Sequence, residues 1–187
     1  INSGVTFTSN QELTIAGNLT NNGTLTQTVG TVTFNGSTTQ TLNPGATNSI
    51  FEVYFTGAGV KNFSGNGLVV GNGNYTVDNT NVNLGSLTHS IASQSVTLIG
   101  TTTYTASSAN MVFNRAGDQS ILASLNCSNF TSSGSGIKTL SGNLTIANDL
   151  VINSGTTLDV DNISNFTISC SGNFTNCLLY TSPSPRD

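Results

Sequence analysis

The sequence contains few charged residues and few residues that favour helices. Only 6% of its 187 residues are charged, tryptophan is absent, and there are three prolines, three cysteines and one methionine. This shortage of Glu, Lys, Arg, Met and Ala excludes an all-α or α/β protein and a coiled coil. Four Lys or Arg residues and a net charge of −4 provide no basic stripe, so no nucleic-acid partner is expected. No apolar run is long enough for membrane insertion.

Four small polar residue types instead make up slightly over half of the chain, as 30 Thr, 26 Asn, 24 Ser and 20 Gly. Threonine suits strands, and Asn and Gly suit tight turns. Apolar residues alternate with these residues in short runs, as Val32 and Phe34 do, and this alternation predicts strands with one inward face. The other inward pairs are Leu13 and Ile15, Val53 and Phe55, Val82 and Leu84, Val96 and Leu98, and Leu158 and Val160.

Turn signals such as Asn22-Gly23 and Asn35-Gly36 separate the strands. Asn-Gly turns also close antiparallel hairpins, so a β-sandwich is the alternative fold.

Long blocks of the sequence recur at a nearly constant spacing. Residues 30–42 return 79 positions later, and residues 59–66 return 77 positions later. Residues 17–21 return as 172–176, after two periods. A fixed period with small drift is typical of stacked repeats. We therefore predict an all-β, right-handed parallel β-helix of seven to nine coils, with about 19 or 26 residues in each coil and Phe34 and Phe113 at equivalent inward sites.

The repeated phrases GTVTFNGSTTQTL, GVKNFSGN and GNLTIANDLVINSGTTLDV resemble the β-helical repeat regions of large secreted bacterial surface proteins and adhesins. The resemblance covers most of residues 1–176. It implies an extracellular or cell-surface location, and a stalk or adhesive array within a longer chain. Its partners would be polysaccharides or other cell-surface molecules. The motifs describe the architecture well and leave the ligand open.

Both ends of the chain depart from the repeat pattern. Residues 177–187 read CLLYTSPSPRD and contain two of the three prolines. This string resembles the translation of a transposase adaptor from sequencing libraries. The chain also begins at Ile1, with no export signal before the first strand. We expect residues 1–176 to be a β-helix repeat segment truncated at both ends, and residues 177–187 to be a non-native tail.

Asp159 and Asp161, with Asp149 and Asn162 nearby, are the strongest candidates for chemistry. Two carboxylates on one outward face can bind calcium or cleave glycosides. Asp159 and Asp161 also stand next to inward positions of the alternating pattern, which is where ordinary solvated residues are found. We favour the latter interpretation, and a carbohydrate-active β-helix enzyme, a lyase or hydrolase, is the alternative.

The few basic residues are expected at the surface. Lys61 and Lys138 share one position in the period, and we expect them to form an exposed pair on one side. Arg115 and Asp118 flank Gly117 and are expected to form a charged turn.

His89 is the single histidine, and one imidazole cannot make a zinc site. Cys127 and Cys170 could form a disulfide in an exported protein. Otherwise we expect them to be small, buried or half-buried thiols.

Threonines at alternate positions, such as Thr31 and Thr33, place hydroxyls on one face, as an ice-binding β-helix would need. One period later Asn110 and Val112 replace them, which favours ordinary outward threonines. No catalytic, cofactor-binding or metal-binding residue is predicted. The sequence predicts a non-catalytic structural or adhesive repeat segment.

Overall fold

The computed structural model describes residues 1–161, 163–164 and 166–177. All of the predicted non-native tail except Cys177 lies outside these residues. The described chain forms 25 strands and no helix, so it has no helix long and apolar enough to cross a membrane. Every pairing between named strands is parallel. The fold is therefore a parallel β-solenoid, as predicted, and the antiparallel β-sandwich is excluded.

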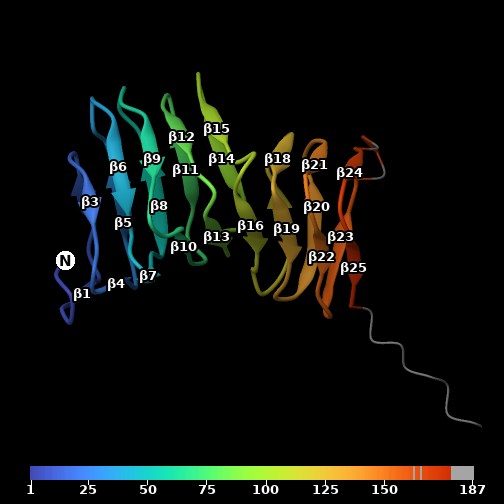
Figure 1. The fold of residues 1–187 in the computed structure, drawn as a ribbon, viewed down its shortest axis with the longest axis horizontal. Coiled ribbons are helices and arrows are strands. Elements are labelled where there is room, and N and C mark those ends of the chain that lie inside the picture. Colours follow the sequence, from blue (N-terminus) through green and yellow to red (C-terminus); the bar gives the residue numbers. More distant parts are fainter. Residues whose placement is uncertain (162, 165, 178–187) are drawn as a thin grey trace, which may run out of the picture.

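Three successive strands make one turn, and the turns stack along the long axis of the molecule (Figure 1). Face 1 contains β1 (Thr6–Ser9), β4 (Thr24–Gln27), β7 (Thr47–Ser49), β10 (Val69–Val70), β13 (Thr88–Ile91), β16 (Asn110–Phe113), β19 (Asn129–Ser132), β22 (Leu150–Ile152) and β25 (Phe174–Asn176). Face 2 contains β2 (Leu13–Ile15), β5 (Thr31–Phe34), β8 (Glu52–Phe55), β11 (Tyr75–Asp78), β14 (Val96–Ile99), β17 (Gln119–Ile121), β20 (Gly136–Leu140) and β23 (Thr156–Asp159). Face 3 contains β3 (Leu19–Thr20), β6 (Gln40–Asn43), β9 (Lys61–Phe63), β12 (Asn81–Asn83), β15 (Thr103–Thr105), β18 (Leu125–Cys127), β21 (Leu144–Ile146) and β24 (Ile168–Cys170).

The 25 strands make eight turns, and β25 begins a ninth, which agrees with the predicted seven to nine coils. Paired residues give the length of each turn. Val53 stands 21 positions after its partner Val32, and Ser132 stands 19 positions after its partner Phe113. The longest step, from Ser95 to Ser120, spans 25 positions. The steps lie between the two predicted coil lengths of about 19 and 26 residues, and most of them are nearer to the shorter.

The long sequence repeat spans eleven strands and not a whole number of turns. Phe34 ends β5 on face 2, whereas Phe113 ends β16 on face 1. Both rings are fully buried, as predicted, but the expectation that they share one site in the stack is wrong. The repeat reproduces a strand–corner–strand unit and moves it by one face. The same sequence unit can therefore occupy different faces of this solenoid.

Inward residues of consecutive turns stack into one apolar core. The rings of Phe34 and Phe55 are stacked with centroids 5.3 Å apart, and those of Phe113 and Phe130 are 5.4 Å apart. Most of the predicted inward residues are buried or half-buried.

Two predicted inward residues are exposed. Val160 is exposed because strand β23 ends at Asp159 and the chain turns at Asp161, where φ is +57°. Leu98 is 39% exposed because it lies at a step in the solenoid.

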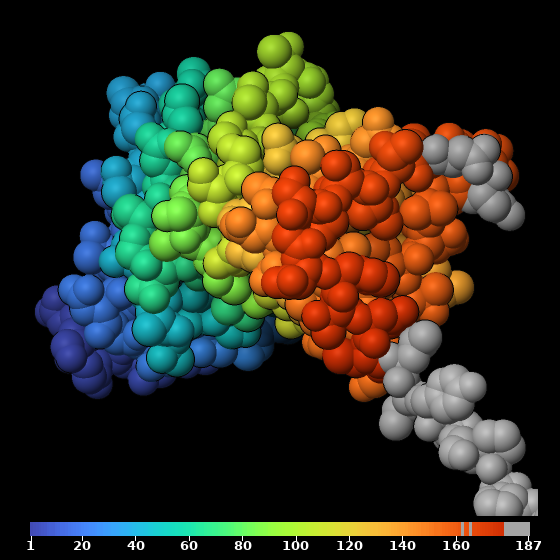
Figure 2. Space-filling model, turned by 45° about the vertical axis from the view of Figure 1, so that its right-hand side comes forward, coloured from blue at the N-terminus to red at the C-terminus, as the bar shows by residue number. Residues whose placement is uncertain are grey.

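This step separates the fifth turn from the sixth. Face 1 is continuous here, but β14 and β15 are the last strands of two five-stranded sheets, and β17 and β18 begin two three-stranded sheets. Among the residues that the structure describes, only the bridge between Ser95 and Ser120 pairs face 2 across the step. The segment from β14 to β15 consequently projects beyond the sixth turn (Figure 1), and Figure 2 shows it as a yellow-green knob at the top of the molecule.

Candidate functional site

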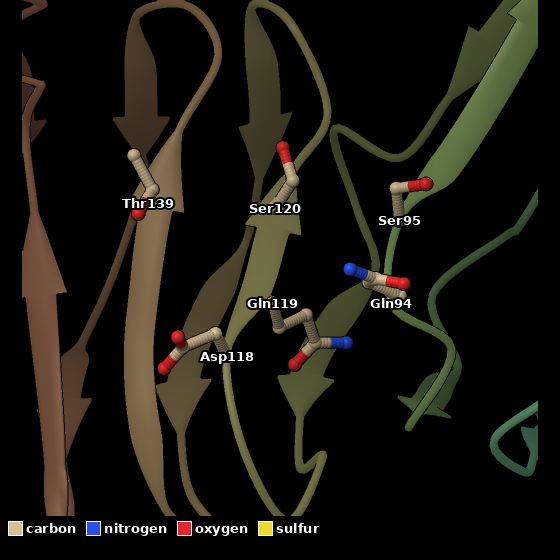
Figure 3. Close-up of a pocket in the computed structure, with 6 residues that line it drawn as sticks. All are labelled: Gln94, Ser95, Asp118, Gln119, Ser120 and Thr139. Carbon is tan, nitrogen blue, oxygen red and sulfur yellow. The ribbon is translucent and has the colours of Figure 1, made fainter.

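An open hollow of about 430 Å³ lies at the step, on face 2. It is lined by Gln94, Ser95, Asp118, Gln119, Ser120 and Thr139 (Figure 3). These residues come from three consecutive turns, at the start of β14, around the start of β17 and on β20. Parallel stacking is what brings them together, since 45 positions separate the first from the last.

Three hydroxyl side chains form a row across the hollow. The bridge between Ser95 and Ser120 aligns the first two, and strand pairing aligns Ser120 with Thr139. The three side chains extend from neighbouring strands (Figure 3). The Ser120 hydroxyl also lies 2.7 Å from the Ser141 hydroxyl. Each hydroxyl group can both donate and accept a hydrogen bond.

One carboxylate and two amides complete the lining. Asp118 is exposed, and its Oδ1 atom accepts a hydrogen bond of 2.9 Å from the backbone N–H of Ile137. Gln119 is buried, and its Nε2 atom donates to the carbonyls of Ile91 and Ser93 at 2.8 Å each. Gln119 therefore fixes the floor, while Gln94 is exposed at the rim.

The chemistry of this lining is that of hydrogen bonding to a neutral polar ligand. Hydroxyls, an amide and a single carboxylate can pair with the hydroxyl groups of a sugar. Glycoside cleavage commonly uses two carboxyl groups facing one bond, and the lining supplies Asp118 alone. The hollow is a candidate binding surface that the sequence analysis missed. Its hydroxyls carry no signal in a chain with 54 Ser and Thr residues, because only the pairing between turns gathers them.

The acidic residues singled out from the sequence lie at two different corners. Asp149 precedes β22, and its Oδ1 atom accepts hydrogen bonds from the backbone and side-chain nitrogens of Asn173. Asp159 and Asp161 follow one another at the end of β23, where each accepts a backbone N–H two residues ahead, at 3.1 Å. These carboxylates cap turns. Asn162 lies outside the described residues.

Within the described part of the chain, no group of three or more His, Cys, Asp or Glu residues could hold a metal ion.

The expectation that Lys61 and Lys138 form an exposed pair is wrong, because both side chains are fully buried. They occupy inward positions of β9 on face 3 and β20 on face 2, so they also lie on different sides. The Lys61 ammonium donates to the carbonyls of Gly36 and Gly59 at 3.1 and 2.6 Å. Burial lowers the pKa of Lys61 from its ordinary value.

Lys138 repeats this arrangement with three carbonyls, those of Arg115, Gly117 and Ser135, each at 2.8 Å. Burial lowers the pKa of Lys138, the Arg115 charge lowers it further, and Asp118 opposes the shift. Each lysine pairs in register with a buried glutamine of the previous turn, Gln40 or Gln119. The shared sequence position thus encodes an internal corner, where side-chain donors satisfy carbonyls that leave the strand ladders.

The predicted charged turn is confirmed. Arg115 and Asp118 flank Gly117, whose φ of +121° belongs to the corner between β16 and β17. Arg115 donates from Nη1 to the carbonyl of Ala92 at 3.1 Å.

His89 is a buried core residue. Its Nδ1 atom accepts the backbone N–H of Leu68 at 3.1 Å, and its Nε2 atom lies 3.0 Å from the carbonyl of Leu84. These partners require a neutral ring with its proton on Nε2. Burial lowers the pKa of His89 to about 4, although the hydrogen bond to Leu84 opposes the shift.

Cys127 and Cys170 are free thiols, one buried and the other half-buried, as expected in the absence of a disulfide. Both pair with Ile146, on opposite sides of β21. They are consequently two strand spacings apart, about 10 Å, beyond the reach of a disulfide. Burial raises the pKa of the Cys127 thiol to about 12, with a further contribution from Cys170.

The alternate threonines point outward, as predicted. Thr33 pairs with Thr14 on the previous turn, but Thr31 and Thr33 pair with Glu52 and Tyr54 on the next turn, so the hydroxyl rank ends at β5. The Thr31 hydroxyl donates to the Glu52 carboxylate at 2.9 Å.

Comparison of the chain with protein-family models, with curated proteins and with solved structures finds no match. The fold described above therefore stands on the sequence and the structure themselves. The sequence and the structure establish that the fold class of this protein is a β-solenoid.

Proposed function

We propose that this chain is a non-catalytic structural or adhesive repeat segment of a bacterial cell-surface protein. The observation that carries the proposal is one uninterrupted core along the whole stack, combined with an outer surface of neutral polar residues. Such a body holds its ends at a fixed separation and offers an extended surface for weak contacts. Each property suits a stalk or an adhesive array.

The core supports the spacer role. Buried apolar residues run from Leu25 in the second turn to Leu150 in the eighth, with no break at the step. A turn in such a stack contacts only its neighbours, so length can grow by adding turns without any change in the core. The structural role therefore needs no specialised site.

The hollow at the step supports the adhesive role. Its hydroxyl row and the exposed Asp118 carboxylate give a polysaccharide several hydrogen-bonding partners along one line. No aromatic residue belongs to the six that line the hollow, so binding there depends on hydrogen bonds and is expected to be weak. An exported adhesive protein would gain strength by presenting many such surfaces.

A polysaccharide panel tests the absence of catalysis. The full chain is incubated with plant, algal and bacterial polysaccharides, with and without calcium, and both retention on the polymer and release of oligosaccharides are measured. We expect weak retention and no release. Retention should fall for Ser120→Val. It should stay unchanged for the control Thr33→Val, because the Thr33 hydroxyl also points outward but lies on β5, far from the hollow. Turnover that disappears in Asp159→Asn, Asp161→Asn or Asp118→Asn would establish the enzyme instead.

Labelling of intact cells tests the location. An antibody against residues 1–176 should label unbroken cells that carry the full-length protein. Labelling that requires lysis of the cells would refute the cell-surface proposal.

A further inference from the structure

Negative charge is concentrated on one face of the solenoid. Five acidic residues lie on face 2 or directly before its strands, and they come from the first, third, fourth, sixth and eighth turns, as Glu12, Glu52, Asp78, Asp118 and Asp159. All five are half-buried or exposed. Asp149 instead lies beside face 1, and the described strands of face 3 contain no acidic residue.

No lysine or arginine side chain within the described residues is exposed to balance this charge. Lys61 and Lys138 are fully buried and turn their ammonium groups to corner carbonyls. Arg115 is half-buried and donates to the carbonyl of Ala92. A surface that carries charges of one sign attracts groups of the opposite sign. The outer surface of face 2 is therefore complementary to a cation.

Neutral donors hold two of these carboxylates in place. Glu52 accepts a hydrogen bond of 2.9 Å from the Thr31 hydroxyl, and bonds of 3.1 Å from the backbone and side-chain nitrogens of Asn74. Asp78 accepts a hydrogen bond from the Tyr54 hydroxyl. Because these donors are uncharged, they orient the carboxylates without neutralising them.

An unbroken row of outward polar side chains runs along the same face. Strand pairing aligns one residue from each of the third to eighth turns in this row, namely Glu52, Asn74, Ser95, Ser120, Thr139 and Asp159. Each is half-buried or exposed, and each carries a side-chain oxygen. With turns about 4.8 Å apart, the row is about 24 Å long. It includes the three hydroxyls of the hollow (Figure 3) and extends beyond them in both directions.

An aromatic ring lies beside this row. Tyr54 pairs in register with Thr76, yet its hydroxyl reaches Asp78, two residues farther along β11. The ring therefore crosses β11 along the surface, where it is half-buried. The face of an aromatic ring attracts ammonium groups, so Tyr54 adds a second element that suits a cationic ligand.

The composition of the row favours a polysaccharide over a basic peptide. An extended peptide commonly pairs its backbone with a free strand edge, whereas the outer surface of face 2 offers side chains. The ammonium groups of a peptide would also leave the hydroxyl and amide side chains of the row unused. A sugar ring carries several hydroxyl groups, which can pair with these side chains between one carboxylate and the next.

We propose that face 2 binds a linear polysaccharide with free amino groups, laid along the axis of the solenoid. The ammonium groups of the polymer meet the carboxylates, and its hydroxyl groups meet the polar row and the hollow. A linear polymer suits this surface because the acidic residues are spread over eight turns. The inference rests on the proposed adhesive function and names the chemical class of its ligand.

Three hexamers test the class of ligand. The affinity of the full chain is measured for a glucosamine hexasaccharide, for its fully N-acetylated counterpart and for hexalysine, at a pH that keeps the free amino groups protonated. We expect the glucosamine hexasaccharide to bind most tightly. Its affinity should fall as the salt concentration rises, because salt screens exposed charges.

Each other result has a defined meaning. Equal affinity for the two hexasaccharides would overturn this inference and leave the adhesive function standing. Tighter binding of hexalysine would overturn it in favour of a basic protein partner. Binding of neither hexasaccharide would also overturn it, and the adhesive function would fall as well only if every other polysaccharide failed to retain the chain.

Charge-matched variants locate the site. Glu52→Gln and Asp118→Asn each remove one charge from face 2, and each should weaken binding of the glucosamine hexasaccharide by about 1.5–5-fold, as expected for one exposed ion pair. The double variant should weaken it by about 2–25-fold if the two effects multiply. Asp149→Asn removes the same charge beside face 1 and should leave the affinity unchanged. Circular dichroism checks that each variant keeps its β structure. Equal losses in all three single variants, or no loss in the double variant, would overturn the proposal.

Discussion

Replacement of Phe55 with alanine should be among the most damaging single changes in this protein. Its ring is fully buried at the centre of an aromatic cluster. It stacks on Phe34 at 5.3 Å, meets Phe63 edge-on at 5.9 Å and contacts Tyr75 at 5.5 Å, measured between ring centroids. The substitution leaves a cavity between three turns, because the parallel ladders on either side hold the backbone in place.

The magnitude follows from these contacts. Truncation of a buried Phe to Ala costs about 3–5 kcal/mol, and aromatic pairs contribute about 0.5–1.5 kcal/mol each beyond the burial of their area. With three ring neighbours, Phe55→Ala should lie at the upper end of the first range. At roughly 2–4 °C per kcal/mol for a chain of this size, the Tm falls by about 10–20 °C.

A graded series makes the test specific. Phe34→Ala, which loses one ring contact, should destabilise less than Phe55→Ala, and the outward Thr33→Ala should change stability by less than about 1 kcal/mol. Urea unfolding followed by circular dichroism measures all three. Equal and small losses for the three variants would refute the inward register of face 2 and, with it, the core described here.

Buried and terminal groups lead to four further predictions. Because the pKa of His89 falls from about 6.5 unfolded to about 4 folded, stability is complete above pH 6.5 and declines as the pH drops toward 4; His89→Asn should flatten this part of the urea-midpoint profile, and an unchanged profile would contradict the assignment. Lys138→Met removes the ammonium donor from three carbonyls, of which those of Arg115 and Ser135 keep a backbone N–H, whereas both carbonyls that lose Lys61 keep another donor; Lys138→Met should therefore lower the urea midpoint by more than Lys61→Met, and the reverse order would count against these corners. Cys127 should resist iodoacetamide in the folded chain and react after unfolding, as mass spectrometry would show, and ready labelling of native protein would mean that the thiol is accessible. Deletion of residues 178–187 should leave the Tm essentially unchanged, and a drop of several degrees would show that this tail belongs to the native protein.

The solenoid can be predicted from the sequence because its signals are local. Alternation at Val32 and Phe34 sets the inward face of one strand, Asn-Gly pairs mark corners, and the regular recurrence of long blocks indicates stacking. The face on which a strand lies cannot be predicted from the sequence of that strand, because it depends on how many corners precede it. Phe34 and Phe113 illustrate this limit, because β16 is the eleventh strand after β5 and therefore lies on a different face.

The lysines illustrate a second limit. Charge predicts exposure in most proteins, and on that ground Lys61 and Lys138 belong at the surface. The corners of this solenoid instead hold carbonyls that point inward, and a long side chain with three donors can satisfy them. The alternation itself already favours burial, since Lys61 stands two residues before the inward Phe63. The candidate hollow has no such signal, because its residues meet only through the pairing of the fifth, sixth and seventh turns.

Consecutive turns of this protein stack in parallel and in register, and paired cysteines measure that register directly. Thr33 and Tyr54 are aligned on β5 and β8, whereas Thr33 and Glu52 are two residues out of register. The variant Thr33→Cys/Tyr54→Cys should form an intramolecular disulfide on oxidation, detected by mass spectrometry of the digested chain. Thr33→Cys/Glu52→Cys should not, because its Cα atoms lie about 8 Å apart. Closure of the second pair as readily as the first, or of neither pair, would contradict the solenoid described here.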